Sequence, residues 1–235
     1  MFPAVTGLIL LPASLFSYTV YRETGYKPLQ ILALGLIFVA VESFLDAYEA
    51  SRLLALAGGD WNRVPDDKLG YLLTVDAIRG IFIVLWAGAE VAFTAGVAGT
   101  EKRFYTRTLP AIIVAVGIVE TIALNFSGIE PLQKRILVSS AGRVLGILVP
   151  VAIISGAYLI VKIWREVGSK SILAWGIAFL SHGFTLPLYP LAKETGSIAL
   201  GLWYLFGGVV PAALAALGAY QLREEARMAA EEVEE

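Results

Sequence analysis

Apolar residues are grouped in seven long blocks along the chain, and short polar connections separate them. The blocks cover residues 4–21, 29–51, 70–97, 108–126, 137–162, 171–191 and 198–221. A helix that crosses the hydrocarbon core of a bilayer needs about 20 mainly apolar residues. Because backbone groups in lipid must be hydrogen-bonded within their own segment, each block is expected to be a helix. The pattern predicts an all-α, polytopic integral membrane bundle of seven transmembrane helices.

The composition agrees with this pattern. Hydrophobic residues make up 57% of the chain and charged residues only 16%, with a mean hydropathy of +0.73. Soluble domains have about 45–50% apolar and about 25% charged residues. We therefore predict a multi-pass protein of the cell membrane, with the lipid bilayer as its surroundings. No basic region precedes the first block, and Pro3 and Pro12 interrupt the apolar stretch, which favours a membrane helix over a removable signal peptide.

Lysine and arginine in the connections predict the orientation. Ten of them lie in the tail and in the loops after the first, third and fifth blocks, against seven on the opposite side. This bias places the N-terminus outside and the C-terminus in the cytoplasm. We divide the chain into a seven-helix transmembrane domain, residues 1–222, and an acidic, helical cytoplasmic tail, residues 223–235. No Lys/Arg-rich patch of the kind that binds nucleic acid is present.

Eight ionisable residues inside the blocks are candidate residues of an ion or substrate pathway. A charged side chain near the bilayer centre costs about 2.5–3.5 kcal/mol on insertion scales, so each one indicates a functional site. At 1.5 Å of rise per residue, three of them fall near the midplane, four lie toward the outer side and one lies in the inner half. In that order they are Glu42, Glu120 and His182; Asp46, Asp76, Arg79 and Arg143; and Glu90.

The second block ends in "VESFLDAYEASR", which places Glu42, Asp46 and Glu49 at spacings of four and three. Residues at these spacings share one face of a helix. We expect Arg79 and Arg143 to neutralise two carboxylates, most simply Asp76 and one acid of the second block. The remaining acids must then be protonated, hydrated or bound to a cation. Glu42 or Glu120 is expected to be neutral at pH 7 or to share a proton with His182, whereas Glu49 is interpreted as a residue near the surface beside Arg52.

The third block carries Arg79, Ile83, Trp86 and Glu90 along one stripe, which predicts that this face points into the bundle. Proline marks helix irregularities at Pro150, Pro187, Pro190 and Pro211, since each removes a backbone hydrogen bond. A carbonyl freed in this way can coordinate an ion or form part of a gate when it faces a cavity.

Several kinds of site are excluded or disfavoured. The chain has no cysteine and one histidine, so a disulfide, a thiolate metal site and a bis-histidine haem are not expected. No lysine lies in the middle of the seventh block, which leaves a retinal Schiff base without an attachment point. The identity of any other cofactor or metal stays open.

Three functions are compatible with these residues. The first is transport or conduction of protons or cations through an outward-facing polar cavity. The second is an intramembrane enzyme that uses a buried carboxyl for acid catalysis on a lipid or isoprenoid substrate, with Trp86 and Trp175 near a cationic intermediate. The third is a non-catalytic sensor or a subunit of a membrane complex. Whether the protein is an enzyme therefore stays open, and its partners could be a proton, a cation, a lipid ligand, a membrane protein or a second copy.

Overall fold

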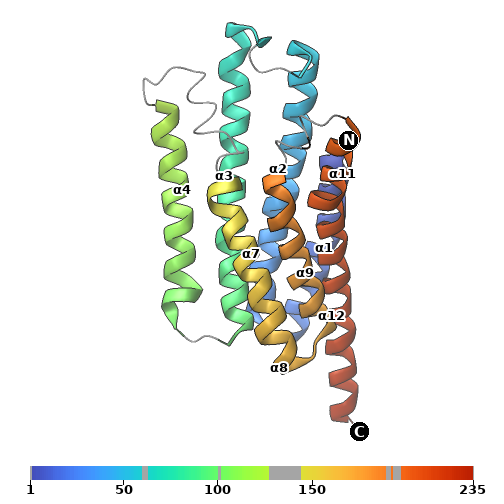
Figure 1. Cartoon of the computed structure of the whole chain (residues 1–235). Helices are drawn as coiled ribbons and strands as arrows, with labels where there is room; N and C mark the ends of the chain where they lie inside the picture. Colours follow the sequence, from blue (N-terminus) through green and yellow to red (C-terminus); the bar gives the residue numbers. More distant parts are fainter. Residues whose placement is uncertain are drawn as a thin grey trace.

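The computed structural model describes residues 2–59, 63–99, 102–126, 144–188, 192 and 197–234, and the regular elements in these ranges are all helical. The first three are long, antiparallel rods: α1 (Phe2–Thr24), α2 (Lys27–Ala57) and α3 (Asp66–Val97) (Figure 1). At the end of α2, Gly58 adopts a φ of 62° and donates its backbone N–H to the Leu54 carbonyl at 3.0 Å. Glycine adopts this left-handed conformation without a Cβ clash, so α2 ends there.

The remaining rods are interrupted by tighter or wider turns. In chain order they are η2 (Phe104–Thr108), α4 (Leu109–Phe126), η3 (Val144–Leu148), α7 (Val149–Tyr158), η4 (Leu159–Trp164), α8 (Arg165–Val167), α9 (Lys170–Thr185), η5 (Leu186–Leu188), α11 (Ser197–Tyr204), η6 (Leu205–Val209) and α12 (Val210–Glu234). η5 is a 3₁₀ turn and the other η elements are π-helical turns.

Six helical stretches in the described ranges are long and apolar enough to cross a membrane. They are Phe2–Thr24, Lys27–Ala57, Asp66–Val97, Phe104–Ile122, Lys170–Leu188 and Ile198–Glu225. The predicted fifth block is represented by a shorter apolar helix, Gly146–Lys162, and its residues 137–143 lie outside the described residues. The prediction of a helical bundle with several membrane-length apolar helices is therefore confirmed, and it points to a multi-pass membrane protein.

The helices form a closed ring with one helix on its outside. Each helix packs against the next in the order α1, α2, α3, α7, α9 and α12, and α12 in turn packs against α1. α4 packs mainly against α3 and lies at the edge of the bundle (Figure 1). α2 ends and α3 begins at one end of the bundle, which we call the α2–α3 end; α1 and α3 end, and α2 and the α4 rod begin, at the opposite end (Figure 1).

Aromatic rings hold three helices of the ring together. Phe93 of α3 meets Trp175 of α9 edge to face with ring centroids 4.9 Å apart, and Trp86 meets Phe179 in the same way at 5.8 Å. The Trp175 indole N–H donates to the Ala215 carbonyl of α12 at 2.9 Å. Each edge-to-face pair contributes about 0.5–1.5 kcal/mol beyond its buried area.

Glycines allow α3 to approach its neighbours closely. A Cβ on Gly35 of α2 would lie 2.8 Å from the Trp86 ring, and one on Gly88 of α3 would lie 2.6 Å from Val114 of α4. Small residues at such crossings are typical of helix association in membranes, because they let the backbones pack directly.

Three π-turns have a common local cause. η2, η3 and η6 each end two residues before a proline, namely Pro110, Pro150 and Pro211. A proline donates no backbone hydrogen bond, and its ring collides with the carbonyl four residues earlier. The wider i→i+5 turn moves that carbonyl out of the way. The predicted irregularities at Pro150 and Pro211 thus take the form of π-turns, whereas Pro12 is accommodated within the continuous α1.

The acidic tail begins as part of the bundle. α12 continues through the predicted domain boundary at residue 222 and runs to Glu234. The Glu225 carboxylate accepts hydrogen bonds from the backbone N–H groups of Lys170 and Ser171 at 3.1 and 3.3 Å, and from the Ser169 hydroxyl at 2.8 Å. These N–H groups at the start of α9 have no partner within the helix, so Glu225 caps it.

Candidate functional site

The candidate site lies between α2 and α3, in the half of the bundle nearer the α2–α3 end. Along α2, Glu42, Asp46 and Glu49 recur about once per turn and face α3, because the helix is uninterrupted over this stretch. α3 contributes Asp76 and Arg79 from the opposite side. We call these five residues the Arg79 cluster.

The Arg79 guanidinium is the centre of the cluster. Its Nη2 lies 2.7 Å from Asp46 Oδ1 and 3.0 Å from Glu42 Oε1. Its Nη1 lies 2.7 Å from Glu49 Oε2 and 3.8 Å from Asp76 Oδ1. One planar cation therefore bridges acids on three successive turns of α2, and the two ends of its guanidinium bind different acids.

The cluster is largely buried and rich in negative charge. The side chain of Arg79 is 12% exposed, and those of the four acids are 7–23% exposed. Within the described ranges, Arg79 is the one cation within 4 Å of Glu42, Asp46 and Glu49. Removing a charge from water costs several kcal/mol unless a partner compensates it. Among the described residues, the cluster therefore holds more carboxylates than Arg79 alone can neutralise.

The expectation for Glu49 is wrong. Glu49 is 6% exposed and is bound by Arg79, so it does not belong to the surface. Arg52, its expected neighbour, is exposed and donates from Nε to the Tyr48 hydroxyl at 3.2 Å. The spacing of four and three was the correct signal, because it already placed Glu49 on the face of Glu42 and Asp46.

The predicted midplane group does not come together. Glu120 is exposed on α4, whose buried positions are Pro110, Gly117 and Thr121. Neighbouring residues on a helix point about 100° apart, so the burial of Thr121 turns Glu120 outward. Arg143 lies outside the described residues.

His182 binds a backbone carbonyl instead of a carboxylate. Its Nδ1–H donates to the Gly207 carbonyl in η6 at 2.6 Å. Gly207 lies four residues before Pro211, and Pro211 has no N–H to bind that carbonyl. Ser181 donates to the neighbouring Phe206 carbonyl at 3.1 Å. In the part of the chain that the structure describes, His182 therefore satisfies a carbonyl that the proline leaves free.

Glu90 is a second buried acid on the same face of α3 as Arg79. Eleven residues separate the two, which is three turns and about 16 Å along the helix. Glu90 is completely buried, and neither of its carboxyl oxygens has a hydrogen-bond partner among the described residues; the same holds for the Thr94 hydroxyl one turn further on. Ile83 and Trp86 between them are 3% and 6% exposed. The prediction that this stripe faces the bundle interior is confirmed.

The geometry resembles an ion-pair network and not a ready metal centre. Among the described residues, no three His, Asp or Glu side chains are arranged so that they could hold a metal ion. The carboxylates converge on the guanidinium instead. Comparison of the chain with protein-family models, with curated proteins and with solved structures gives no match. The function therefore has to be argued from the site.

Proposed function

We propose that the chain is a seven-helix protein of the cell membrane, with the N-terminus outside and the C-terminus in the cytoplasm, that moves protons or small cations across the bilayer. The observation that supports this most is the gathering of four carboxylates on one buried guanidinium. In this orientation the Arg79 cluster lies in the outer half of the membrane. Buried acids in such numbers are expensive and are typical of ion and proton pathways.

The Arg79 cluster would serve as the outer binding site. A proton that reaches Glu42 or Asp46 neutralises one of the acids that share Nη2, and the guanidinium then pairs more strongly with the other. A small cation would act through the same carboxylates by competing with Arg79. In either case the arginine exchanges partners and stays paired, so loading does not leave an isolated charge in the bundle.

Glu90 would serve as the inner binding residue of the pathway. Because Ile83 and Trp86 are packed between it and the cluster, no chain of polar side chains connects the two along this face of α3. Transfer then requires α3 to move relative to its neighbours, so that Glu90 and the Arg79 cluster are open in turn. Alternation of this kind around buried charged groups is how many transporters keep the two sides separate.

Two observations favour transport over the other functions in this proposal. The rings of Trp86, Trp175 and Phe179 are in contact with one another or with Phe93 and form part of the core, which leaves them to packing and not to a substrate. A purely structural subunit has no need of Glu90, because a buried carboxyl that has no partner among the described residues does not hold these helices together.

Flux through purified protein in liposomes tests the proposal. Proton and cation flux would be compared for the wild type, Glu90→Gln, Asp46→Asn and Glu120→Gln, each under an imposed pH or cation gradient. We expect flux to fall by at least about tenfold when Glu90 or Asp46 is neutralised and to be unchanged in Glu120→Gln, because Glu120 points away from the cluster.

Glu120→Gln is the matched control, since it makes the same kind of change in another apolar helix. Flux that is lost equally in all three variants would indicate a general loss of fold. Wild-type protein that carries no proton or cation current at any pH, with all variants folded, would contradict the proposal and favour a complex subunit.

A further inference from the structure

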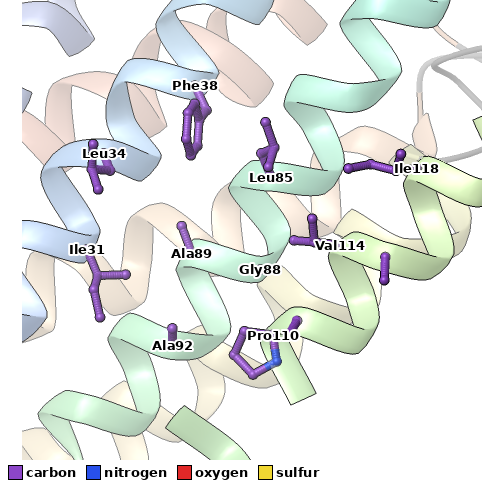
Figure 2. Close-up of a pocket in the computed structure, with 12 residues that line it drawn as sticks. Ile31, Leu34, Phe38, Leu85, Gly88, Ala89, Ala92, Pro110, Val114 and Ile118 are labelled. Atoms are coloured by element: carbon purple, nitrogen blue, oxygen red, sulfur yellow. The ribbon is translucent and has the colours of Figure 1, made fainter. Parts of the chain in front are cut away.

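An apolar groove runs between α2 and α4 with α3 as its floor. Its volume is about 550 Å³, and all of the residues that line it are apolar. It forms because α4 packs on α3 beside α2. The small residues Gly88, Ala89 and Ala92 of α3 leave the floor of the groove low. Figure 2 shows the walls, with Ile31 and Leu34 on α2 and Pro110 and Val114 on α4.

The groove lies in the half of the bundle away from the α2–α3 end. It uses the first turns of α2 and α4 and the last turns of α3. All three helices belong to stretches that are long and apolar enough to cross a membrane. At this depth the surrounding medium is hydrocarbon, so an entirely apolar groove that opens to the outside of the bundle fits a lipid chain.

Two exposed basic residues continue the walls of the groove beyond its end. Lys27 lies four residues before Ile31 on α2, and Arg107 lies three residues before Pro110 on the α4 rod. Residues four apart share a helix face, so Lys27 lies one turn beyond the Ile31 wall of α2. Arg107 lies in the π-turn η2, which leads directly into the Pro110 wall of α4. Neither Lys27 nor Arg107 forms an ion pair with another described residue. Two further basic residues, Lys102 and Arg103, are exposed between α3 and η2.

We propose that this groove is a binding site for one membrane phospholipid with an anionic headgroup. A hydrocarbon chain lies in the groove, and the phosphate is held by Lys27 and Arg107, which supply the opposite charge at the level where a headgroup lies. Basic residues at a membrane surface attract anionic lipids by about 1 kcal/mol each. The proposal concerns the outer wall of the bundle and does not depend on the transport function.

Lipid retention by purified protein tests the site. Wild-type protein is released from nanodiscs that contain phosphatidylglycerol and phosphatidylcholine with the same acyl chains, and bound lipid is counted by native mass spectrometry. We expect phosphatidylglycerol to be retained over phosphatidylcholine. In K27Q/R107Q the preference should fall about thirtyfold, because two interactions of about 1 kcal/mol each are lost. In A111L/A115L, which adds side chains to the exposed wall of the groove on α4, retention of both lipids should fall.

The matched control for charge is R165Q/R223Q, which removes two exposed arginines from α8 and α12. The control for volume is A213L, on an exposed face of α12. Equal retention of the two lipids by the wild type, or an equal loss in R165Q/R223Q, would overturn the headgroup assignment. Unchanged retention in A111L/A115L would overturn the groove. A dimer that dissociates only in A111L/A115L would assign the groove to a second copy and also overturn the proposal.

Discussion

Arg79 and Glu90 lie on one face of the same helix, yet their surroundings are opposite. Arg79 faces the stretch of α2 that carries three acids, and every one of them is within 3.0 Å of the guanidinium. Glu90 lies at the same height in the bundle as the aromatic core, where Trp86 and Phe93 on either side of it pack against α9. The first residue has more partners than its charge can neutralise, and the second has none among the described residues.

The difference separates two effects of burying a charge. At Arg79 burial strengthens several attractions at once, and the arginine stabilises the contact between α2 and α3. At Glu90 burial brings the cost of desolvation, and no hydrogen bond from a described residue compensates it. Substitutions at the two positions should therefore change stability in opposite directions.

Loss of Arg79 should have the largest effect. Arg79→Gln leaves Glu42, Asp46 and Glu49 buried beside one another without the cation that they share, which is expected to lower the free energy of unfolding by about 3–5 kcal/mol. Thermal unfolding in detergent measures the change. Arg52→Gln, at an exposed arginine of α2, should have little effect. An Arg79→Gln protein that unfolds like the wild type would show that the cluster is fully compensated by other groups.

Replacement of Glu90 should stabilise the protein. Glu90→Leu removes a buried carboxyl that has no partner among the described residues and fills the same space with an apolar side chain, so we expect a gain of about 1–3 kcal/mol. The same unfolding measurement detects it. Together with loss of flux, this gain would identify Glu90 as a residue kept for function at the expense of stability. A marked loss of stability would instead mean that Glu90 is bound by a group or water that holds it in place.

Removal of the Glu225 cap should loosen the start of α9. Glu225→Ala takes the acceptor away from the Lys170 and Ser171 N–H groups, with an expected cost of about 1–2 kcal/mol. Hydrogen exchange should become faster at the first turn of α9 and remain unchanged in the aromatic core. Glu23→Ala, at an exposed glutamate of α1, is the matched control.

A smaller effect is expected at His182. His182→Phe leaves the Gly207 carbonyl without its donor, at a cost of about 1 kcal/mol. In a Pro211→Ala background the helix can supply a backbone N–H to that carbonyl, so the same histidine change should cost less. A double-mutant cycle measures this coupling. Strict additivity would mean that the proline is not the reason for the histidine contact.

Glu120→Gln should have the smallest effect, within about 0.5 kcal/mol in detergent, because the side chain is exposed and away from the cluster. A larger change would indicate that Glu120 is covered by a partner in the folded protein. Thermal unfolding beside the Arg79 and Glu90 variants gives the comparison directly.

The sequence predicts what depends on one helix and fails where two helices must be placed against each other. Glu42, Asp46 and Glu49 share a face because α2 is continuous, and helical spacing alone determines that. The rotation of α4 about its own axis is a tertiary property, so depth in the membrane could not show that Thr121, and not Glu120, is buried. Depth alone likewise gave His182 a carboxylate partner, although the sequence already contained the proline that frees the Gly207 carbonyl.

The apolar blocks predict which helices exist better than they predict where the helices end. An apolar block marks the part of a helix that lies in lipid, whereas the backbone continues while its hydrogen bonds can form. α12 extends past residue 221 because glutamate and alanine favour helix and because Glu225 binds the start of α9. α2 extends to Ala57, where Gly58 ends it.

The π-turns before Pro110, Pro150 and Pro211 also set an angle. Each turn holds about one residue more than an α-helical turn, so it rotates everything after it by about 100°. At η6 this rotation presents Ala215 and Gly218 to the Trp175 indole. Deleting a single residue from Leu205–Val209 would give a more regular helix with the wrong azimuth. Pro110, Pro150 and Pro211 thus help to determine which side of α4, α7 and α12 faces the interior of the bundle.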